Sequence, residues 1–243
     1  MGVVLLANSS LRTIASDEMS RGGEMIRRLA RRLTSIGWRG HLHLDVRRQM
    51  IGFHLEQVGD QSILVCGDSR VEAAFLPSSI AGFPVVNAGI GGATISLLGD
   101  ELAGIIGRRK ILLLVLSAGI NDAKMENRAP INVSDFRADL QATVEKFAQN
   151  AERIVLTSIP PVEDGKPLGP QFYDGALICQ FNGEIAACAE RNGIDFLDLA
   201  TPMTNENRNL IAGMSTDGVH LNRAGYEIWR PALVSGIERL LNR

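Results

Sequence analysis

The sequence predicts an α/β fold, a three-layer α/β/α sandwich in which a five-stranded parallel sheet lies between helices. From residue 61 onward, short apolar runs of strand length alternate with longer segments of helical periodicity, and most connections between them are short. The longest apolar run, Ile111–Leu116, contains no polar residue, as expected for a strand buried on both faces. Right-handed crossovers then place the strands in one parallel sheet with helices on both faces.

Five short segments are expected to form the strands. The first consists of four apolar residues and is followed by Gly67, Asp68 and Ser69. The fourth ends before Pro160 and Pro161, because proline cannot donate a hydrogen bond within a sheet. In chain order the strands are Ile63–Cys66, Phe83–Ala88, Ile111–Leu116, Arg153–Thr157 and Ile194–Asp198.

Helical periodicity predicts five helices that follow these strands. They are Arg70–Leu76, Ile95–Gly107, Asp135–Asn150, Gly175–Asn192 and Asn222–Leu241. Ser134 is expected to cap the third of them, because a serine hydroxyl accepts a hydrogen bond from the first helical turn. The connection Val162–Asp174 is long and rich in glycine and proline, which indicates either a substrate lid or an irregular crossover.

The composition is that of a globular protein with one sizeable core. The chain has 243 residues, 45% hydrophobic and 21% charged, with a net charge of −2, so nothing indicates binding to nucleic acid. No apolar run is long enough to span a bilayer, and Gly2–Ala7 is short for a signal peptide and lacks a basic flank, so a cytoplasmic location is expected. Cys179 and Cys188 are roughly 13 Å apart on a predicted helix, too far for a disulfide.

Residues 1–60 differ from the rest of the chain. They contain nine arginines, no lysine and six acidic residues, a net charge of +3. Within them, Met25–Leu33 has apolar residues at helical spacing, with arginines on the other face. We expect residues 1–60 to be a basic, helical extension packed on a domain of residues 61–243; the alternative is a helix that binds a membrane or an acidic partner. His41 and His43 alternate as in a strand, and nothing nearby completes a metal site.

Polar or glycine-rich turns follow the first three strands. These turns are Gly67–Ser69, Gly89–Thr94 and Gly119–Asp122, and a late loop, Asp217–His220, adds an acid and a histidine. Because the carboxyl ends of parallel strands lie at one edge of a sheet, these segments are expected to converge there. This edge is where open α/β sheets bind their ligands.

Taken together, the four segments resemble the four sequence blocks of the SGNH (GDSL-type) hydrolases, in the same order and at the same strand ends. The resemblance covers about residues 61–243 and implies a flavodoxin-like SGNH hydrolase fold. It also implies a serine esterase that works through an acyl-enzyme and needs no cofactor. One departure is Arg70, which stands where the older motif has leucine. We expect its side chain to face outward from the first helical turn.

The residues of a catalytic triad are present. A serine hydroxyl needs a nearby base to become a nucleophile, and His220 is the only histidine after the first sixty residues. Asp217, three residues earlier, is placed to accept the Nδ1–H of His220, which leaves Nε2 to face Ser69. Asp68 and Asp122 are expected to support the loops by accepting hydrogen bonds, without a part in the chemistry.

By resemblance, three donors form an oxyanion hole. They are the backbone N–H of Ser69, the backbone N–H of Gly92 and the side-chain amide of Asn121. Gly92 is preferred to Gly91 because the glycine of the family stands two residues before the threonine, here Thr94. Glycine allows the backbone to approach a substrate closely, and an amide donates without a competing charge.

The expected partner is a small-molecule ester with a short acyl group, such as acetyl on a carbohydrate or lipid. An acyltransferase, or a lysophospholipase or thioesterase on the same site, is the nearest alternative. An alternative of a different class is a phosphate- or nucleotide-binding flavodoxin-like module, because Gly89–Thr94 is almost a dinucleotide fingerprint; its final glycine is missing. The Gly-x-Ser-x-Gly elbow of α/β-hydrolases is absent around Ser69, and one histidine cannot supply the ligands of a metal-dependent hydrolase.

Overall fold

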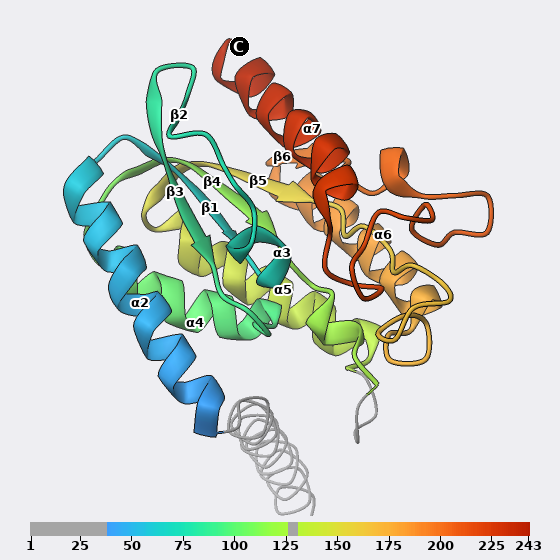
Figure 1. The fold of residues 1–243 in the computed structure, drawn as a ribbon. Helices are drawn as coiled ribbons and strands as arrows, with labels where there is room; N and C mark the ends of the chain where they lie inside the picture. The colour runs from blue at the N-terminus through green and yellow to red at the C-terminus, as the bar shows by residue number, and fades with distance from the viewer. Residues whose placement is uncertain (1–37, 126–130) are drawn as a thin grey trace, which may run out of the picture. The chain divides into compact units, whose positions relative to one another are not determined.

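A sheet with strand order β2-β3-β1-β4-β5-β6 forms the centre of the fold (Figure 1). The structure, a computed structural model, describes residues 38–125 and 131–243. The chain divides into two compact units, Met1–His43 and Leu44–Arg243, and the second contains the sheet. The predicted helix Met25–Leu33 lies outside the described residues. The parallel strands are β1 (Ser62–Gly67), β3 (Phe83–Gly89), β4 (Ile111–Ser117), β5 (Ala151–Thr157) and β6 (Asp195–Leu197).

The predicted α/β fold with five parallel strands is confirmed, and the sheet has one further strand. This strand, β2 (Ser79–Ile80), pairs antiparallel with β3. The two residues between them, Ala81 and Gly82, have φ angles of 50° and 85°, as in the tight hairpin turns that suit strand twist. The sequence pattern does not reveal β2 because two residues show no alternation and Ala-Gly is not a typical hairpin signal.

The register of the central strands aligns their carboxyl ends. Gly67, the last residue of β1, pairs with Gly89 of β3 on one side and with Ser117 of β4 on the other. All six residues of β1 are buried, so this strand has little freedom to shift. The three turns that follow β1, β3 and β4 therefore start at the same level of the sheet.

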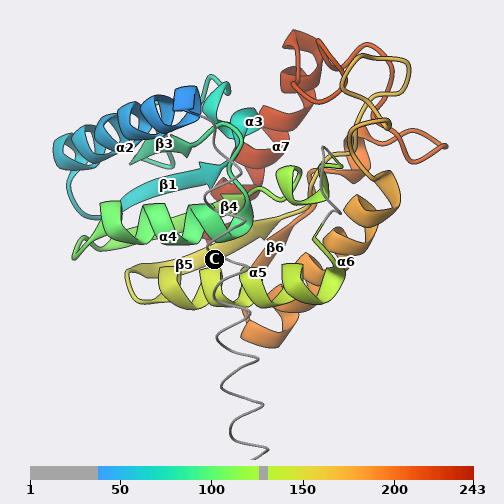
Figure 2. The ribbon, with the colours of Figure 1, turned by 90° about the horizontal axis from the view of Figure 1, so that it is seen from below.

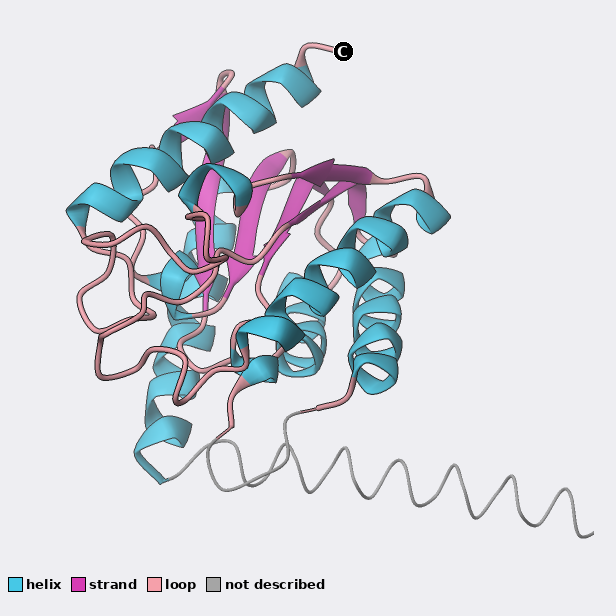
Figure 3. Cartoon of the chain, turned by 90° about the vertical axis from the view of Figure 1, so that its right-hand side faces the viewer, coloured by secondary structure: helices cyan, strands magenta, loops and turns pink. Residues whose placement is uncertain are grey.

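Helices cover both faces of the sheet (Figures 2 and 3). In β1, Ile63 and Val65 belong to a buried cluster with Trp229 and Leu233 of the last helix, which covers one face. The alternate residues of β1 point to the other face, where α4, α5 and α6 lie (Figure 2). The helices are α2 (Trp38–Val58), α3 (Ser69–Glu72), α4 (Ile95–Ile106), α5 (Val133–Ala148), α6 (Gly175–Asn192) and α7 (Arg223–Leu241). No helix of the described residues is long and apolar enough to cross a membrane.

Asparagine, not serine, caps α5. The side-chain oxygen of Asn132 accepts a hydrogen bond from the N–H of Asp135 at 2.9 Å, so α5 begins before the predicted start. The Ser134 hydroxyl donates to Asn132 instead, and the predicted cap at Ser134 is wrong. Asparagine and serine cap helices about equally well, so propensity alone does not distinguish the two positions.

His41 and His43 lie in helix α2, so their strand-like alternation is not a strand. Three positions is too short a pattern to identify a strand when longer helical spacing surrounds it. Leu44, Ile51 and Leu55, which follow at intervals of seven and four, are buried. From Leu44 onward, α2 therefore buries an apolar stripe within the unit that contains the sheet.

Candidate functional site

Ser69 lies at the tight turn between strand β1 and the short helix α3. Asp68 caps this helix by accepting a hydrogen bond from the N–H of Arg70 at 2.9 Å. Gly67 leaves no room for a side chain, because a Cβ there would lie 2.2 Å from the Val71 side chain and 2.3 Å from the Ser117 carbonyl oxygen. The local geometry of this turn therefore requires a glycine at position 67 and uses the acid at position 68 as the helix cap.

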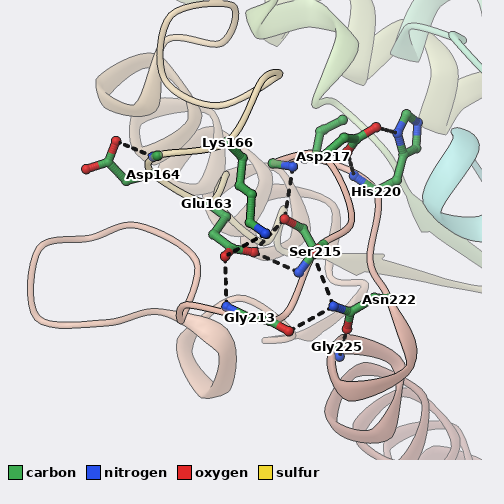
Figure 4. A network of polar contacts seen from close by, with 12 residues as sticks. Glu163, Asp164, Lys166, Gly213, Ser215, Asp217, His220, Asn222 and Gly225 are labelled. Atoms are coloured by element: carbon green, nitrogen blue, oxygen red, sulfur yellow. Dashed lines mark hydrogen bonds and ion pairs between the residues drawn. The ribbon is translucent and has the colours of Figure 1, made fainter.

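The structure brings Ser69, His220 and Asp217 together in a chain of hydrogen bonds. The Nε2 atom of His220 lies 3.0 Å from Ser69 Oγ, although the two residues are 151 positions apart. On the other side of the ring, Nδ1 lies 2.6 Å from Asp217 Oδ2 (Figure 4). The other carboxylate oxygen of Asp217 accepts the backbone N–H groups of Val219 and His220 at 3.1 and 2.9 Å. The acid and the base thus share one turn of backbone.

The environment of Asp217 keeps its carboxyl group ionised. Burial by itself raises the pKa of this carboxyl, but hydrogen bonds from the His220 ring and from the N–H groups of His220 and Val219 outweigh it, so the pKa lies below its ordinary value. An ionised carboxylate only accepts hydrogen bonds. It therefore favours the tautomer with the proton on Nδ1, which leaves Nε2 as an acceptor for the Ser69 hydroxyl.

The turn after β3, Gly89–Thr94, does not use all of its backbone N–H groups for hydrogen bonds within the protein. Four of its N–H groups donate within the protein: Gly89 to Asn87 Oδ1, Ile90 to the Gly67 carbonyl, Gly91 to Glu72 Oε2 and Ala93 to the Ile90 carbonyl. The N–H groups of Gly92 and Thr94 have no acceptor among the described residues, and of these two residues Gly92 is exposed whereas Thr94 is half-buried. Its φ of +76° is one that glycine adopts readily. Because Gly91 is engaged, the geometry supports Gly92 as the donor, and this role stays a prediction.

Asn121 lies in the short 3₁₀ helix after β4 (Asn121–Ala123), beside the same turn. Its side-chain nitrogen donates to the Ala93 carbonyl at 3.0 Å, and this nitrogen carries a second hydrogen. Asp122 is buried and accepts the N–H of Ile95 at 3.2 Å, which joins this segment to the start of α4. Across residues 38–125 and 131–243, no group of three or more His, Cys, Asp or Glu side chains is arranged to hold a metal ion.

Arg70 is buried, so the prediction that it faces outward is wrong. Its Nε donates to the Val219 carbonyl at 2.8 Å, and its two terminal nitrogens donate to the carbonyls of Pro160 and Pro161 at 2.5 and 3.0 Å. The residue after Ser69 is thereby joined to the residue before His220. Burial lowers the pKa of the Arg70 guanidinium, and the nearby Asp68 carboxylate opposes this shift. The sequence holds no signal for this role, because the three acceptors are backbone atoms of distant loops.

Replacement of Arg70 by methionine is expected to lower the free energy of unfolding by about 3 kcal/mol, because three buried carbonyl groups lose their donors. Denaturant unfolding measures this loss. Arg223→Met is the control, because the Arg223 side chain is 92% exposed and, among the described residues, pairs only with Glu227 on its own helix. Equal unfolding midpoints for the two variants would contradict the structural role of Arg70.

The connection Val162–Asp174 holds the loop that carries Asp217 and His220 (Figure 4). The Glu163 carboxylate accepts the N–H of Gly213 at 2.7 Å, and the N–H and hydroxyl of Ser215 at 2.8 and 2.5 Å. The Ser215 hydroxyl in turn accepts the N–H of Gly218 at 2.9 Å. Backbone bonds from Glu163 and Leu168 reach Gly218 and Asp217. These contacts fit an irregular crossover that supports the site, and the sequence pattern did not reveal Glu163 or Ser215.

The sequence matches a known protein family over most of its length. Residues 55–228 match the GDSL-like lipase/acylhydrolase family, and all four sequence blocks lie within this range. No match to a curated protein was found.

Solved structures share the fold at low sequence identity. A Streptococcus pneumonia protein, provisionally described as a platelet activating factor, has a TM-score of 0.70 at 23% identity, with 88% of this chain and 99% of that chain covered. A GDSL-like lipase from Bacteroides thetaiotaomicron has a TM-score of 0.61 at 22% identity and coverages of 79% and 98%. An acetylxylan esterase from Geobacillus stearothermophilus has a TM-score of 0.56 at 18% identity and coverages of 74% and 95%.

Proposed function

Because the chain belongs to the GDSL-like lipase/acylhydrolase family, we propose that it is a serine esterase that cleaves carboxylic esters through an acyl-enzyme on Ser69. The observation that carries this proposal is the hydrogen-bonded chain from Ser69 through His220 to Asp217, with distances of 3.0 and 2.6 Å. A neutral imidazole in hydrogen-bond contact with a serine hydroxyl is the arrangement that makes the hydroxyl a nucleophile.

In the first half of the reaction, Ser69 Oγ attacks the ester carbonyl carbon while His220 Nε2 takes the hydroxyl proton. The carbonyl oxygen gains negative charge, and in this proposal donors at Ser69, Gly92 and Asn121 stabilise it. His220 then gives its proton to the leaving alcohol as the ester C–O bond breaks. In the second half, water attacks the acyl-enzyme with His220 again as the base, which releases the carboxylic acid and regenerates Ser69.

The substrate class that we propose is an ester of a short acyl group, acetyl above all, on a carbohydrate or a lipid. The His220 side chain is 44% exposed, so the reacting atoms lie close to solvent, as suits a bulky polar alcohol with a small acyl group. A related fold occurs in an acetylxylan esterase and in the protein provisionally described as a platelet activating factor. Transfer of the acyl group to an alcohol in place of water uses the same residues.

A phosphate-binding function is not favoured by the glycine turn. A phosphate cradle needs several backbone N–H groups that point at the ligand. In the turn after β3, the N–H groups of Gly89, Ile90, Gly91 and Ala93 donate to acceptors of the protein itself. The exposed N–H of Gly92 suits one oxyanion better than a phosphate.

Turnover of nitrophenyl esters of increasing acyl length tests the proposed function. We expect kcat/KM to be highest for the acetyl ester and to fall with each longer chain. Mass spectrometry of the quenched reaction should show an acetyl group on the peptide that contains Ser69. A second arm with an added alcohol measures acyl transfer against hydrolysis. Absence of turnover with every ester, together with absence of an acyl adduct, would overturn the proposal.

A further inference from the structure

Arg47 of helix α2 reaches the turn that carries the proposed oxyanion donor. Its Nε donates to the Gly89 carbonyl at 2.9 Å, and a terminal nitrogen donates to the Asn87 carbonyl at 3.2 Å. Both acceptors lie at the end of β3, at the start of the glycine turn. Arg47 precedes the residues that match the family, which begin at residue 55. Arg47 therefore contacts the glycine turn from a segment that lies outside the residues matched by the family.

Glu72 extends this contact to the other side of the turn. The Arg47 guanidinium lies 3.7 Å from the Glu72 carboxylate, and their side chains are 17% and 21% exposed. The same carboxylate accepts the N–H of Gly91 at 2.5 Å. Arg47 thus holds carbonyl groups before the turn, and Glu72 holds an N–H within it. The two residues fix the backbone immediately before Gly92.

The turn needs such support because packing does not hold Gly92. A Cβ at this position would meet no atom within 4 Å, and the residue is exposed. Glycine also has the widest range of accessible backbone conformations. A donor to an oxyanion acts only when its N–H is already aimed at the developing charge, and a shift of about 1 Å costs up to roughly a hundred-fold in rate.

We propose that Arg47 is a positioning residue for the oxyanion hole, so that helix α2 forms part of the working esterase site. The proposal rests on the proposed function for its kinetic consequence. Arg47 does not touch the substrate; it acts through the carbonyls of Asn87 and Gly89 and through Glu72. Its loss alters the position of the Gly92 N–H, whereas Ser69, His220 and Asp217 keep their mutual contacts.

Arg47→Met and Arg48→Met form a matched pair for the test. Both remove one arginine from the same helix, but Arg48 pairs with Glu101 and Asp45 and makes no bond to the glycine turn. We expect Arg47→Met to lower kcat for an acetyl ester by about 10- to 100-fold with little change in KM, since a contact that matters in the transition state is weakened. Arg48→Met should keep the kcat of the wild type. Arg47→Lys, which keeps the charge but not the fork of donors, should fall between them.

Hydrogen exchange of the backbone gives a readout that does not depend on turnover. The peptide that spans residues 87–95 should exchange faster in Arg47→Met than in Arg48→Met, while exchange of the peptide that contains His220 stays unchanged.

If exchange and kcat are the same in the two variants, the proposal is overturned even though the wild type is an active esterase. If the wild type has no esterase activity, the proposed function fails, and the exchange of residues 87–95 still decides whether Arg47 holds the turn. Equal unfolding midpoints for Arg47→Met and Arg48→Met exclude a general loss of stability as the cause of a difference in kcat. If Arg47→Met does not fold, Arg47→Lys is compared with Arg48→Met instead.

Discussion

Ser69→Ala is expected to lower kcat for an acetyl ester by roughly 10⁵- to 10⁶-fold, because no other group in the site can form the acyl-enzyme. His220→Ala should lower kcat by a similar factor, since the Ser69 hydroxyl is then left without a base to take its proton. The double variant should be no worse than either single one, because the two residues act as a unit. The residual rate reflects the oxyanion donors and substrate binding alone. Initial rates measured with freshly purified protein test these expectations.

The Ser69→Ala comparison needs a stability control and a labelling control. Ser69 Oγ bonds to the His220 ring at the surface of the site, so its removal should leave the unfolding midpoint close to that of the wild type. A fluorophosphonate probe should label the wild-type protein once and leave Ser69→Ala unlabelled. Turnover by Ser69→Ala at the wild-type rate would contradict the assigned nucleophile and with it the proposed function.

The strands, the turns that follow them and the acid–histidine pair could be predicted from the sequence, because the patterns that indicate them are local. Apolar runs of strand length identified all five parallel strands, and the turns after β1, β3 and β4 follow from strand register. Asp217 and His220 could be paired because they are only three positions apart within one loop. In each case, the pattern that carries the information lies within a few residues of the feature that it predicts.

The supporting residues could not be predicted because their partners are backbone atoms far away in the chain. Arg70 donates to carbonyls that lie 90, 91 and 149 residues later, and backbone carbonyls leave no trace in a sequence. Glu163 binds N–H groups about fifty residues away. Arg47 reaches β3 across 40 and 42 residues. Charged residues are usually exposed, but Arg70 and Glu163 are buried and Arg47 is partly buried, so the ordinary expectation fails for all three.

These supports explain how distant residues keep their contact distances. Arg70 joins the nucleophile turn to Val219, and Glu163 holds Gly213 and Ser215 in the loop that leads to Asp217. Burial raises the pKa of Glu163, but the hydrogen bonds from Ser215 and Gly213 and the Lys166 charge outweigh it, so the pKa lies below its ordinary value. A group with a lowered pKa in the folded state stabilises the fold above its unfolded pKa, and this contribution disappears as pH falls through the folded pKa. The loop that carries the acid and the base is therefore expected to lose this support in acid.

Asp217→Asn is expected to lower kcat by about 10⁴-fold without loss of the fold, because the change alters the His220 tautomer more than its position. In the wild type, the Asp217 carboxylate can only accept from Nδ1, which keeps Nε2 available to Ser69. An asparagine amide can donate to Nδ1, which moves the ring proton to Nε2 and removes the base from the nucleophile. Asp217 also stabilises the imidazolium that forms during attack, and a neutral amide does not. Steady-state rates with the acetyl ester measure the loss.

The matched control is Asp164→Asn, which removes one negative charge from the neighbouring connection. Asp164 is exposed and accepts only the N–H of Gly165, so its replacement should leave kcat unchanged (Figure 4). The pH dependence of kcat/KM gives a second test of the role of Asp217. Because hydrogen bonds hold the pKa of Asp217 below its ordinary value, Asp217 stays ionised as the pH falls to the ordinary range of an aspartate. Protonation of Asp217 should therefore add nothing to the acid limb of kcat/KM in the wild type, and a single proton should describe that limb. A limb steep enough to require two protons, or an Asp217→Asn variant as active as Asp164→Asn, would show that this carboxylate does not orient His220.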